Sequence, residues 1–227
     1  MECLKGLKLM PDSSVDLIIT DPPYNVDYNK KSAMLQKTGR SRAKQVERDA
    51  HFKDSFLDYK KWCAEIFRVL KDNSHAYIFC ADAQISFWKK FMVQAGFKFR
   101  NTLIWVKNRQ GLDVTHGLKY AYRSEFCLFF NKGVKKLNKL GLNNILKFKC
   151  CSCNIHPTQK PIDLLRFLII NSSIHGDLIL DSFMGSGSTA VACIDSGRNY
   201  VGFELSEHYW IESLKRLKKS DNQIRIF

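Results

Sequence analysis

A short apolar run that stops at two prolines constrains this chain more than any other feature. Residues 15–20 (Val-Asp-Leu-Ile-Ile-Thr) favour a buried strand, and Asp21-Pro22-Pro23-Tyr24 follows it directly. Proline lacks an N–H and fixes φ, so the strand cannot continue past Asp21. The sequence therefore predicts a strand whose carboxyl end presents a carboxylate, a stiffened main chain and an aromatic ring. Ligands bind at that edge in open α/β sheets.

Helical and extended patterns alternate along the rest of the chain. The predicted helices are residues 3–10, 58–71, 83–95, 162–170 and 188–196, and a last helix capped by Ser206 with Trp210, Leu214 and Leu217 facing inward. The predicted strands are 15–20, 75–80, 100–106, 125–130, 177–181 and 200–203. This alternation indicates an α/β fold with a doubly wound, mostly parallel sheet. A length of 227 residues with 45% hydrophobic content predicts a single domain over residues 1–227.

A glycine-rich turn joins one predicted strand to the helix that follows it. Residues 181–189 read Asp-Ser-Phe-Met-Gly-Ser-Gly-Ser-Thr, and Glu204 follows the next strand. Glycines permit a tight turn and a close approach of a ligand to the main chain, although a purely structural turn would also explain them. An acid about twenty residues further on is where nucleotide-binding folds hold ribose hydroxyls. No lysine follows the glycines, so the pattern favours an adenosine-containing cofactor over a triphosphate.

Basic residues gather in two polar segments, residues 25–55 and 107–150. Lys and Arg outnumber Asp and Glu by 36 to 22, which gives a formal charge of +14. A field of this sign attracts polyanions, although charge runs are also common on solvated surfaces. We interpret residues 25–55 as a basic loop that binds nucleic acid and residues 107–150 as a candidate substrate-reading region. The candidate nucleic-acid contacts are Lys30, Lys31, Arg40, Arg42, Lys44, Arg109, Lys119 and Arg123.

Taken together, these motifs resemble the S-adenosylmethionine-dependent amino-methyltransferases of DNA, in the permuted group where D-P-P-Y precedes F-x-G-x-G. The match includes Asp21 to Tyr24, residues 105–108 (Trp-Val-Lys-Asn), 156–161 (His-Pro-Thr-Gln-Lys-Pro) and 183–187 (Phe-Met-Gly-Ser-Gly), and Glu204. The resemblance implies a circularly permuted, Rossmann-like methyltransferase sheet with a small target-recognition insertion. It also implies S-adenosylmethionine as the cofactor, S-adenosylhomocysteine as its product and duplex DNA as the substrate.

The same resemblance implies roles for individual residues. The catalytic residues would be Asp21, Pro22 and Tyr24: the carboxylate and the Pro22 carbonyl accept the N–H groups of the target amine, and the aromatic ring stacks on a flipped base. The implied cofactor contacts are Glu2, Cys3, Asp21, His156, Thr158, Lys160, Asp181, Phe183, Gly185, Gly187, Ser188, Thr189 and Glu204. Met1-Glu2-Cys3 aligns with a Gly-Asp-Cys of the family, so the glycine is missing and the acid is Glu.

Four readings of the function stay open at this point. The leading one is site-specific methylation of the adenine N6 amino group. Its nearest alternative is cytosine N4 methylation, in which Ser more often replaces Asp21. A non-catalytic DNA-binding relative is the third reading, although intact Asp21, Tyr24 and glycines speak against it. The fourth is methylation of RNA or of a protein amide, and Asn in place of Asp21 would have favoured the amide. A homodimer and a cognate restriction endonuclease of a restriction-modification system are possible partners of such an enzyme.

Several function classes find no support in the sequence. No uncharged apolar run approaches the roughly 18 residues of a membrane helix, and residues 1–5 lack a signal-peptide core, so we expect a cytoplasmic protein that does not contact membranes. Cys150, Cys151, Cys153 and His156 lack a second well-spaced ligand pair, so we expect no metal. The absence of a Pro-Cys box argues against ring-carbon methylation of cytosine.

Overall fold

The computed structural model describes residues 1–23, 58–108, 120, 123–150 and 159–220. Along these residues the elements are α1 (Cys3–Leu9), β1 (Val15–Thr20), α4 (Tyr59–Val69), β2 (Leu70–Cys80), the 3-10 helix η1 (Asp82–Gln84), α5 (Ile85–Gln94), β3 (Lys98–Lys107), β4 (Ser124–Lys132), β5 (Ile145–Phe148), α6 (Ile162–Ser172), β6 (Leu178–Asp181), α7 (Ser188–Ile194), β7 (Asn199–Gly202) and α8 (Glu207–Ser220). The predicted helices and strands are confirmed, with shifted ends, and β5 is an addition.

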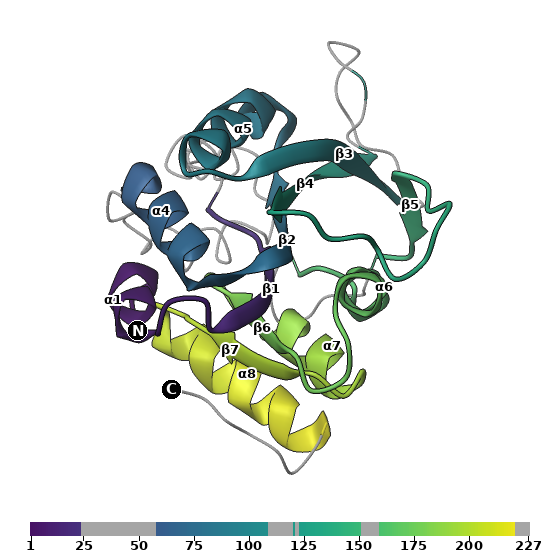
Figure 1. Ribbon diagram of the computed structural model, residues 1–227. Coiled ribbons are helices and arrows are strands. Elements are labelled where there is room, and N and C mark those ends of the chain that lie inside the picture. The colour runs from purple at the N-terminus through teal and green to yellow at the C-terminus, as the bar shows by residue number, and fades with distance from the viewer. Residues whose placement is uncertain (24–57, 109–119, 121–122, 151–158, 221–227) are drawn as a thin grey trace, which may run out of the picture.

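The strands of the described residues form one seven-stranded sheet in the order β5-β3-β4-β2-β1-β6-β7 (Figure 1). β4 runs antiparallel to its neighbours β2 and β3, whereas every other pair of neighbours is parallel. The prediction of a mostly parallel sheet is therefore confirmed. The parallel strands β1 and β6 lie side by side, with Leu17 opposite Ile179 and Ile18 opposite Leu180.

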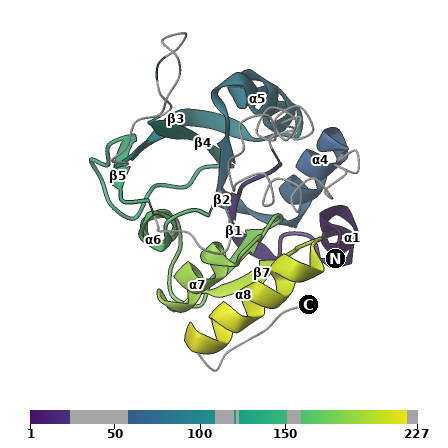
Figure 2. The same ribbon diagram turned by 180° about the vertical axis from the view of Figure 1, so that it is seen from behind.

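Helices cover both faces of this sheet. Alternate strand residues feed two separate cores: Leu17 and Ile19 of β1 face the core that contains α6 and α7, and Ile18 faces the core that contains α1, α4 and α5. Figures 1 and 2 show these two groups of helices on opposite sides of the sheet. The chain therefore leaves β1 toward one face of the sheet and β6 toward the other. In open α/β sheets, ligands bind outside the carboxyl ends of two such strands. None of the helices in the described residues is long and apolar enough to cross a membrane.

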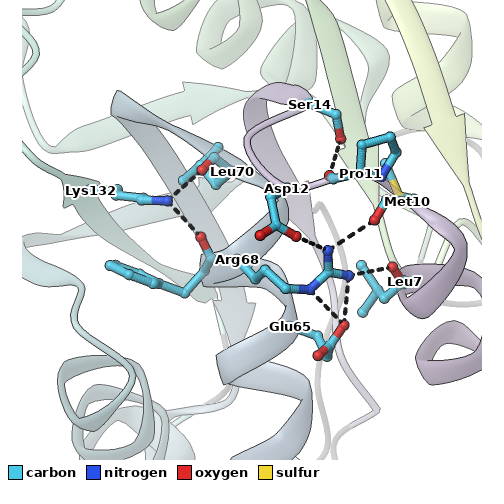
Figure 3. Close-up of polar contacts among 10 residues, drawn as sticks. Leu7, Met10, Pro11, Asp12, Ser14, Glu65, Arg68, Leu70 and Lys132 are labelled. Atoms are coloured by element: carbon cyan, nitrogen blue, oxygen red, sulfur yellow. Dashed lines mark hydrogen bonds and ion pairs between the residues drawn. The ribbon is translucent and has the colours of Figure 1, made fainter.

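Arg68 of α4 forms hydrogen bonds with the C-terminal end of helix α1 (Figure 3). Its guanidinium donates to the carbonyl oxygens of Leu7 at 2.8 Å and Met10 at 2.9 Å. It also forms ion pairs with Asp12 at 2.5 Å and Glu65 at 2.8 Å. The last carbonyls of a helix have no partner within the helix, so Arg68 completes the end of α1 from a different element. The start of the chain is held against α4 in this way.

The predicted inner face of α8 is wrong at one position. Trp210 has 39% of its surface exposed, whereas Tyr209, Ser213 and Leu217 are buried. Positions four residues apart share one side of a helix, so the face at 209, 213 and 217 turns Trp210 away from the core. Leu217 lies inside as predicted, and Leu214 is partly buried.

The strand β5 was not predicted because it is short and lies at the edge of the sheet. It pairs in parallel with β3, Ile104 opposite Ile145, and of its four residues only Leu146 is buried. Such a strand shows too little alternation to be distinguished from a loop. The range 107–150 therefore includes β4 and β5 of the sheet as well as the basic segment between them.

Replacement of Arg68 by Met should lower the free energy of unfolding by about 2–3 kcal/mol, because several charge-assisted hydrogen bonds are lost together. Urea unfolding followed by circular dichroism measures the change. Arg166→Met is the matched control, because Arg166 pairs with Asp163 on the surface, where their side chains are 45% and 70% exposed. The control should change stability by less than about 0.5 kcal/mol. Equal losses in both variants would contradict the role given to Arg68.

Candidate functional site

The Asp181 carboxylate, at the end of β6, accepts hydrogen bonds from the end of β1, from the glycine-rich turn and from α7. Its Oδ1 accepts hydrogen bonds from Thr20 Oγ1 at 2.9 Å and from the Phe183 N–H at 3.1 Å. Its Oδ2 accepts from Thr189 Oγ1 of α7 at 2.6 Å. Burial raises the pKa of Asp181 to about 6, although these hydrogen bonds oppose the rise. The sequence analysis missed Thr20, which links the end of β1 to this group.

The glycine-rich turn has the conformation that its sequence predicts. Gly185 has φ +52°, and a Cβ built there would meet no atom of the described residues within 4 Å, so these residues leave its main chain open. Gly187 has φ +78° and caps α7, and a Cβ on it would lie 3.0 Å from that of Ser213 in α8. Gly187 thus permits close packing of the turn on α8, whereas Gly185 leaves room for a ligand. The buried Ser182 Oγ has no hydrogen-bond partner among the described residues.

Glu204, which follows β7, contacts the glycine-rich turn through its side chain. Its Oε2 accepts from the Gly185 N–H at 2.8 Å and its Oε1 from the Ser206 N–H at 2.8 Å. Burial raises the pKa of Glu204, and the backbone N–H groups that it accepts oppose this rise. The carboxylate is therefore preorganised beside the open main chain at Gly185, as a site for the hydroxyls of an adenosine-containing cofactor requires.

The N-terminus reaches the same edge of the sheet. The amino group of Met1 donates to the carbonyl oxygen of Glu204 at 2.6 Å. A Cβ on Gly6 of α1 would lie 2.3 Å from the Phe203 ring, so this glycine permits α1 to pack directly on the end of β7. Cys3 is buried in that contact, and burial raises the pKa of its thiol to about 11. Residues 1–3 and Glu204, at opposite ends of the sequence, are neighbours in the fold.

Four charged side chains alternate in sign from Asp21 into the sheet. Lys160 Nζ pairs with Asp21 Oδ2 and lies 3.3 Å from Glu125 Oε2, and Lys107 Nζ pairs with Glu125 Oε1. Lys160 has only 6% of its side chain exposed. Burial alone would lower its pKa, but the carboxylates of Asp21 and Glu125 outweigh burial and raise it. Burial would likewise raise the pKa of Glu125, but Lys160 and Lys107 lower it.

Arg216 of α8 contacts the glycine-rich turn through Ser186 and Ser188. Its Nη1 donates to the Ser186 carbonyl oxygen at 2.7 Å and lies 3.3 Å from Ser188 Oγ. The Gln159 amide, oriented with its oxygen toward Arg216, adds a contact at 3.0 Å. The sequence analysis missed Arg216 because a basic residue on an amphipathic helix has the pattern of a solvated side chain. It missed Glu125 and Lys107 for a similar reason, since nothing in a strand pattern reports which charges will meet.

The predicted site residues fall into two groups. Those that the structure describes are Glu2, Cys3, Asp21, Pro22, Lys160, Asp181, Phe183, Gly185, Gly187, Ser188, Thr189 and Glu204. Arg123 is also described, and its carbonyl oxygen accepts from the Lys107 N–H at 2.8 Å at the base of the segment between β3 and β4. Outside the described residues lie Tyr24, Lys30, Lys31, Arg40, Arg42, Lys44, Arg109, Lys119, His156 and Thr158.

Two consequences for ligands follow from this geometry. Among the described residues, no group of three or more His, Cys, Asp or Glu side chains could hold a metal ion. A polar organic cofactor could contact the main chain at Gly185, the carboxylate of Glu204 and the Ser182 hydroxyl, which has no hydrogen-bond partner in the described part of the chain. Asp21 is the acidic residue that directly follows β1.

Comparison with known proteins agrees with this arrangement. The DNA methylase family model matches residues 15–215. The type II methyltransferase M.HpaI of Haemophilus parainfluenzae is 32% identical over 248 residues, which cover 96% of this chain and 73% of that protein. The crystal structure of the M1.HpyAVI–SAM complex is 27% identical, with a TM-score of 0.72 and coverage of 95% of this chain and 96% of that one.

A further solved structure shares the fold at lower sequence identity. It is the cytosine-N4-specific PvuII DNA methyltransferase, 17% identical, with a TM-score of 0.72 and coverage of 99% of this chain and 86% of that one. The family model covers most of the chain, and a relative is 32% identical over nearly its whole length. The chain is therefore a DNA methyltransferase that belongs to the DNA methylase (N6/N4 methyltransferase) family.

Proposed function

We propose that this protein transfers a methyl group from S-adenosylmethionine to the N6 amino group of adenine within a short specific site of duplex DNA. One observation carries the proposal: Asp21 directly follows β1, the strand that pairs with β6, and Lys160 pairs with its carboxylate. A carboxylate at this place can accept an N–H of an amine that enters beside the glycine-rich turn. Modification of DNA in a restriction-modification system would be its biological setting.

The chemistry explains why an amine needs Asp21 and Pro22. The lone pair of an exocyclic amine is delocalised into the base ring, so the nitrogen is a poor nucleophile. If Asp21 and the Pro22 carbonyl each accept one N–H, the nitrogen is drawn toward tetrahedral geometry and its lone pair is aimed at the methyl group. Positive charge that develops on the nitrogen is then stabilised by a preorganised carboxylate and dipole. In-line alignment lowers the barrier further.

The cofactor would lie over the glycine-rich turn. S-adenosylmethionine supplies an electrophilic methyl group on a sulfonium centre when it is bound. Gly185 would leave the main chain open to it, Glu204 would accept its ribose hydroxyls, and Phe183 would line its methionine side. Its adenine would lie toward Glu2 and Cys3, and His156, Thr158 and Lys160 would border its methionine end. The solved M1.HpyAVI–SAM complex, 27% identical to this chain, supports the choice of cofactor.

Adenine is preferred to cytosine because of one side chain. The resemblance associates Ser at the first position of the D-P-P-Y box with N4-cytosine enzymes, and this chain has Asp21. The alternative is methylation of cytosine N4, and the fold shared with the cytosine-N4-specific PvuII enzyme is compatible with it. The two reactions need almost the same geometry around the amine, so the product must be identified directly.

Duplex DNA would be held by the basic segments. Between β4 and β5 and along β5, the exposed lysines include Lys136, Lys139, Lys147 and Lys149, and residues 132–149 contain no acid. These ammonium groups would pair with phosphates, while base-reading side chains come from residues 109–123 and Tyr24 stacks on the flipped base. The basic loop at residues 25–55 would supply further phosphate contacts. A homodimer or a cognate endonuclease would add partners to this complex.

Duplex DNA incubated with the protein and S-adenosylmethionine should yield N6-methyladenine, measured by nucleoside mass spectrometry. Asp21→Ala protein provides the background. Methylated cytosine without methylated adenine would replace the leading proposal by the N4 alternative. Cofactor binding without methyl transfer to any duplex would favour the non-catalytic relative.

Asp21 and Gly185 should affect different steps. Asp21→Ala should slow single-turnover methyl transfer at least about 100-fold, because it removes an acceptor that acts in the transition state. Its dissociation constant for S-adenosylmethionine, measured by calorimetry, should stay close to that of the wild type. Gly185→Val should show the opposite effect, since its side chain would fill the open space and strain a backbone with φ +52°. Wild-type turnover by Asp21→Ala would disprove the mechanism.

DNA binding should weaken steeply with salt, because bound Lys and Arg release counterions from the phosphates. Lys136→Ala/Lys139→Ala should reduce the slope of log K against log salt by about two, as each phosphate contact contributes about one. The matched control is Lys215→Ala/Lys218→Ala, which removes the same charge from α8, at the other end of the molecule from β5 (Figure 1). An equal change in both double variants would remove the role assigned to the segment before β5.

A further inference from the structure

Glu125 is a buried acid that the proposed chemistry does not use. It lies in β4 opposite Trp105 of β3 and its side chain is 19% exposed. Its two oxygens face two lysines: Oε1 pairs with Lys107 and Oε2 lies 3.3 Å from Lys160 Nζ. Lys160 lies between Glu125 and Asp21 and pairs with both. Glu125 can therefore influence Asp21 through Lys160 without contacting it.

We propose that Glu125 is a positioning residue, which holds Lys160 so that Lys160 orients the Asp21 carboxylate toward the target amine. The inference rests on the proposed function, since it assumes that Asp21 accepts an N–H of that amine. A carboxylate carries lone pairs on both oxygens, so Asp21 can accept from Lys160 at Oδ2 and still accept from a substrate amine. Lys160 thereby restricts rotation of the carboxylate.

The charges explain why Lys160 needs a second carboxylate. An ammonium group with 6% of its side chain exposed is costly to bury unless it is paired. Asp21, Lys160, Glu125 and Lys107 alternate in sign, so their formal charges sum to zero. Asp21 alone would leave Lys160 dependent on the one carboxylate that the reaction also uses. With Glu125 present, the lysine keeps a partner while Asp21 turns to the amine.

The frame around Glu125 is suited to positioning. The pairing of β3 with β4 sets Trp105 opposite Glu125 and Val106 opposite Ser124. The Lys107 N–H donates to the Arg123 carbonyl oxygen at 2.8 Å, which fixes the backbone beside this pair. Lys160 lies just before Pro161, the N-cap of α6, and its Nζ lies 5.1 Å from the centre of the Phe79 ring. The ammonium group is thus held between a strand, a helix start and an aromatic face.

Glu125→Gln removes the charge and keeps the size of the side chain. Single-turnover methyl transfer at saturating S-adenosylmethionine and DNA should slow about 10- to 100-fold, because the Asp21 carboxylate loses its orientation. The dissociation constants of both ligands should change less than about threefold, and Glu125→Asp should recover part of the rate. Glu65→Gln is the matched control: it removes the same charge from the Arg68 pair, where Glu65 is 23% exposed. It should lower stability and leave the rate unchanged.

The pH dependence separates positioning from a structural role. Loss of the Glu125 carboxylate removes one of the two charges that hold the pKa of Lys160 up against burial. The pKa of Lys160 should therefore fall, and the alkaline limb of the rate–pH profile should move to lower pH in Glu125→Gln. Lys107→Met removes a neighbouring cation, so it should move that limb to higher pH or leave it in place. NMR of lysines labelled at Cε follows the Lys160 titration without turnover.

The outcomes are distinguishable. If the wild type transfers no methyl group to DNA, the proposed function fails, and the NMR titration still reports whether Glu125 holds Lys160. If the wild type is active and Glu125→Gln has its rate and pH profile, the positioning role is disproved. If Glu125→Gln does not fold, Glu125→Asp and Lys107→Met decide. A wild-type rate in Glu125→Asp, or a shift of the alkaline limb to lower pH in Lys107→Met, would overturn the inference.

Discussion

The parallel pairing of β1 with β6 is the constraint on which the rest of this site depends. The elements that follow these neighbouring strands, α4 after β1 and α7 after β6, pack on opposite faces of the sheet. In open α/β sheets, ligands bind outside the carboxyl ends of two such strands. Thr20 and Asp181 then join the two ends by a hydrogen bond of 2.9 Å. Asp21 directly follows one strand and the glycine-rich turn directly follows the other. In the proposed reaction, the order of the strands would bring the methyl acceptor and the methyl donor together.

Buried charge is the second organising feature. Arg68 anchors α1 on the outside of the fold by pairing with carbonyl oxygens and carboxylates of two elements. Lys160 uses the same principle at the reacting edge, where two carboxylates compensate for its burial. Breaking such a pair leaves an uncompensated charge in a poorly solvated place, so these groups define a single arrangement of their elements. In one case the arrangement holds a helix, and in the other it holds the Asp21 carboxylate.

Local patterns made most of the fold predictable. The alternation of strands and helices indicated the mostly parallel sheet. The helix expected from residue 58 is also present, and Asp58 Oδ1 accepts from the Lys61 N–H of α4 at 3.0 Å. The failures have local causes as well. β5 is a four-residue edge strand with little pattern, and the inner face of α8 was assigned to Trp210 instead of Tyr209 because hydrophobicity does not fix a helix's rotation. Neither error concerns β1 or β6, whose carboxyl ends carry Asp21 and the glycine-rich turn.

The sequence by itself determined the local structure of two segments. The prolines that follow Asp21 end β1 before that residue, and the glycines before α7 permit a tight, open turn. Both features follow from the backbone conformations that proline and glycine allow, which do not depend on the rest of the chain. Only the tertiary structure decided which groups meet. Lys107, Glu125, Lys160 and Asp21 come from four separate segments, and residues 1–3 reach Glu204 from the far end of the chain. Such contacts depend on strand order and packing, and no local sequence pattern encodes them.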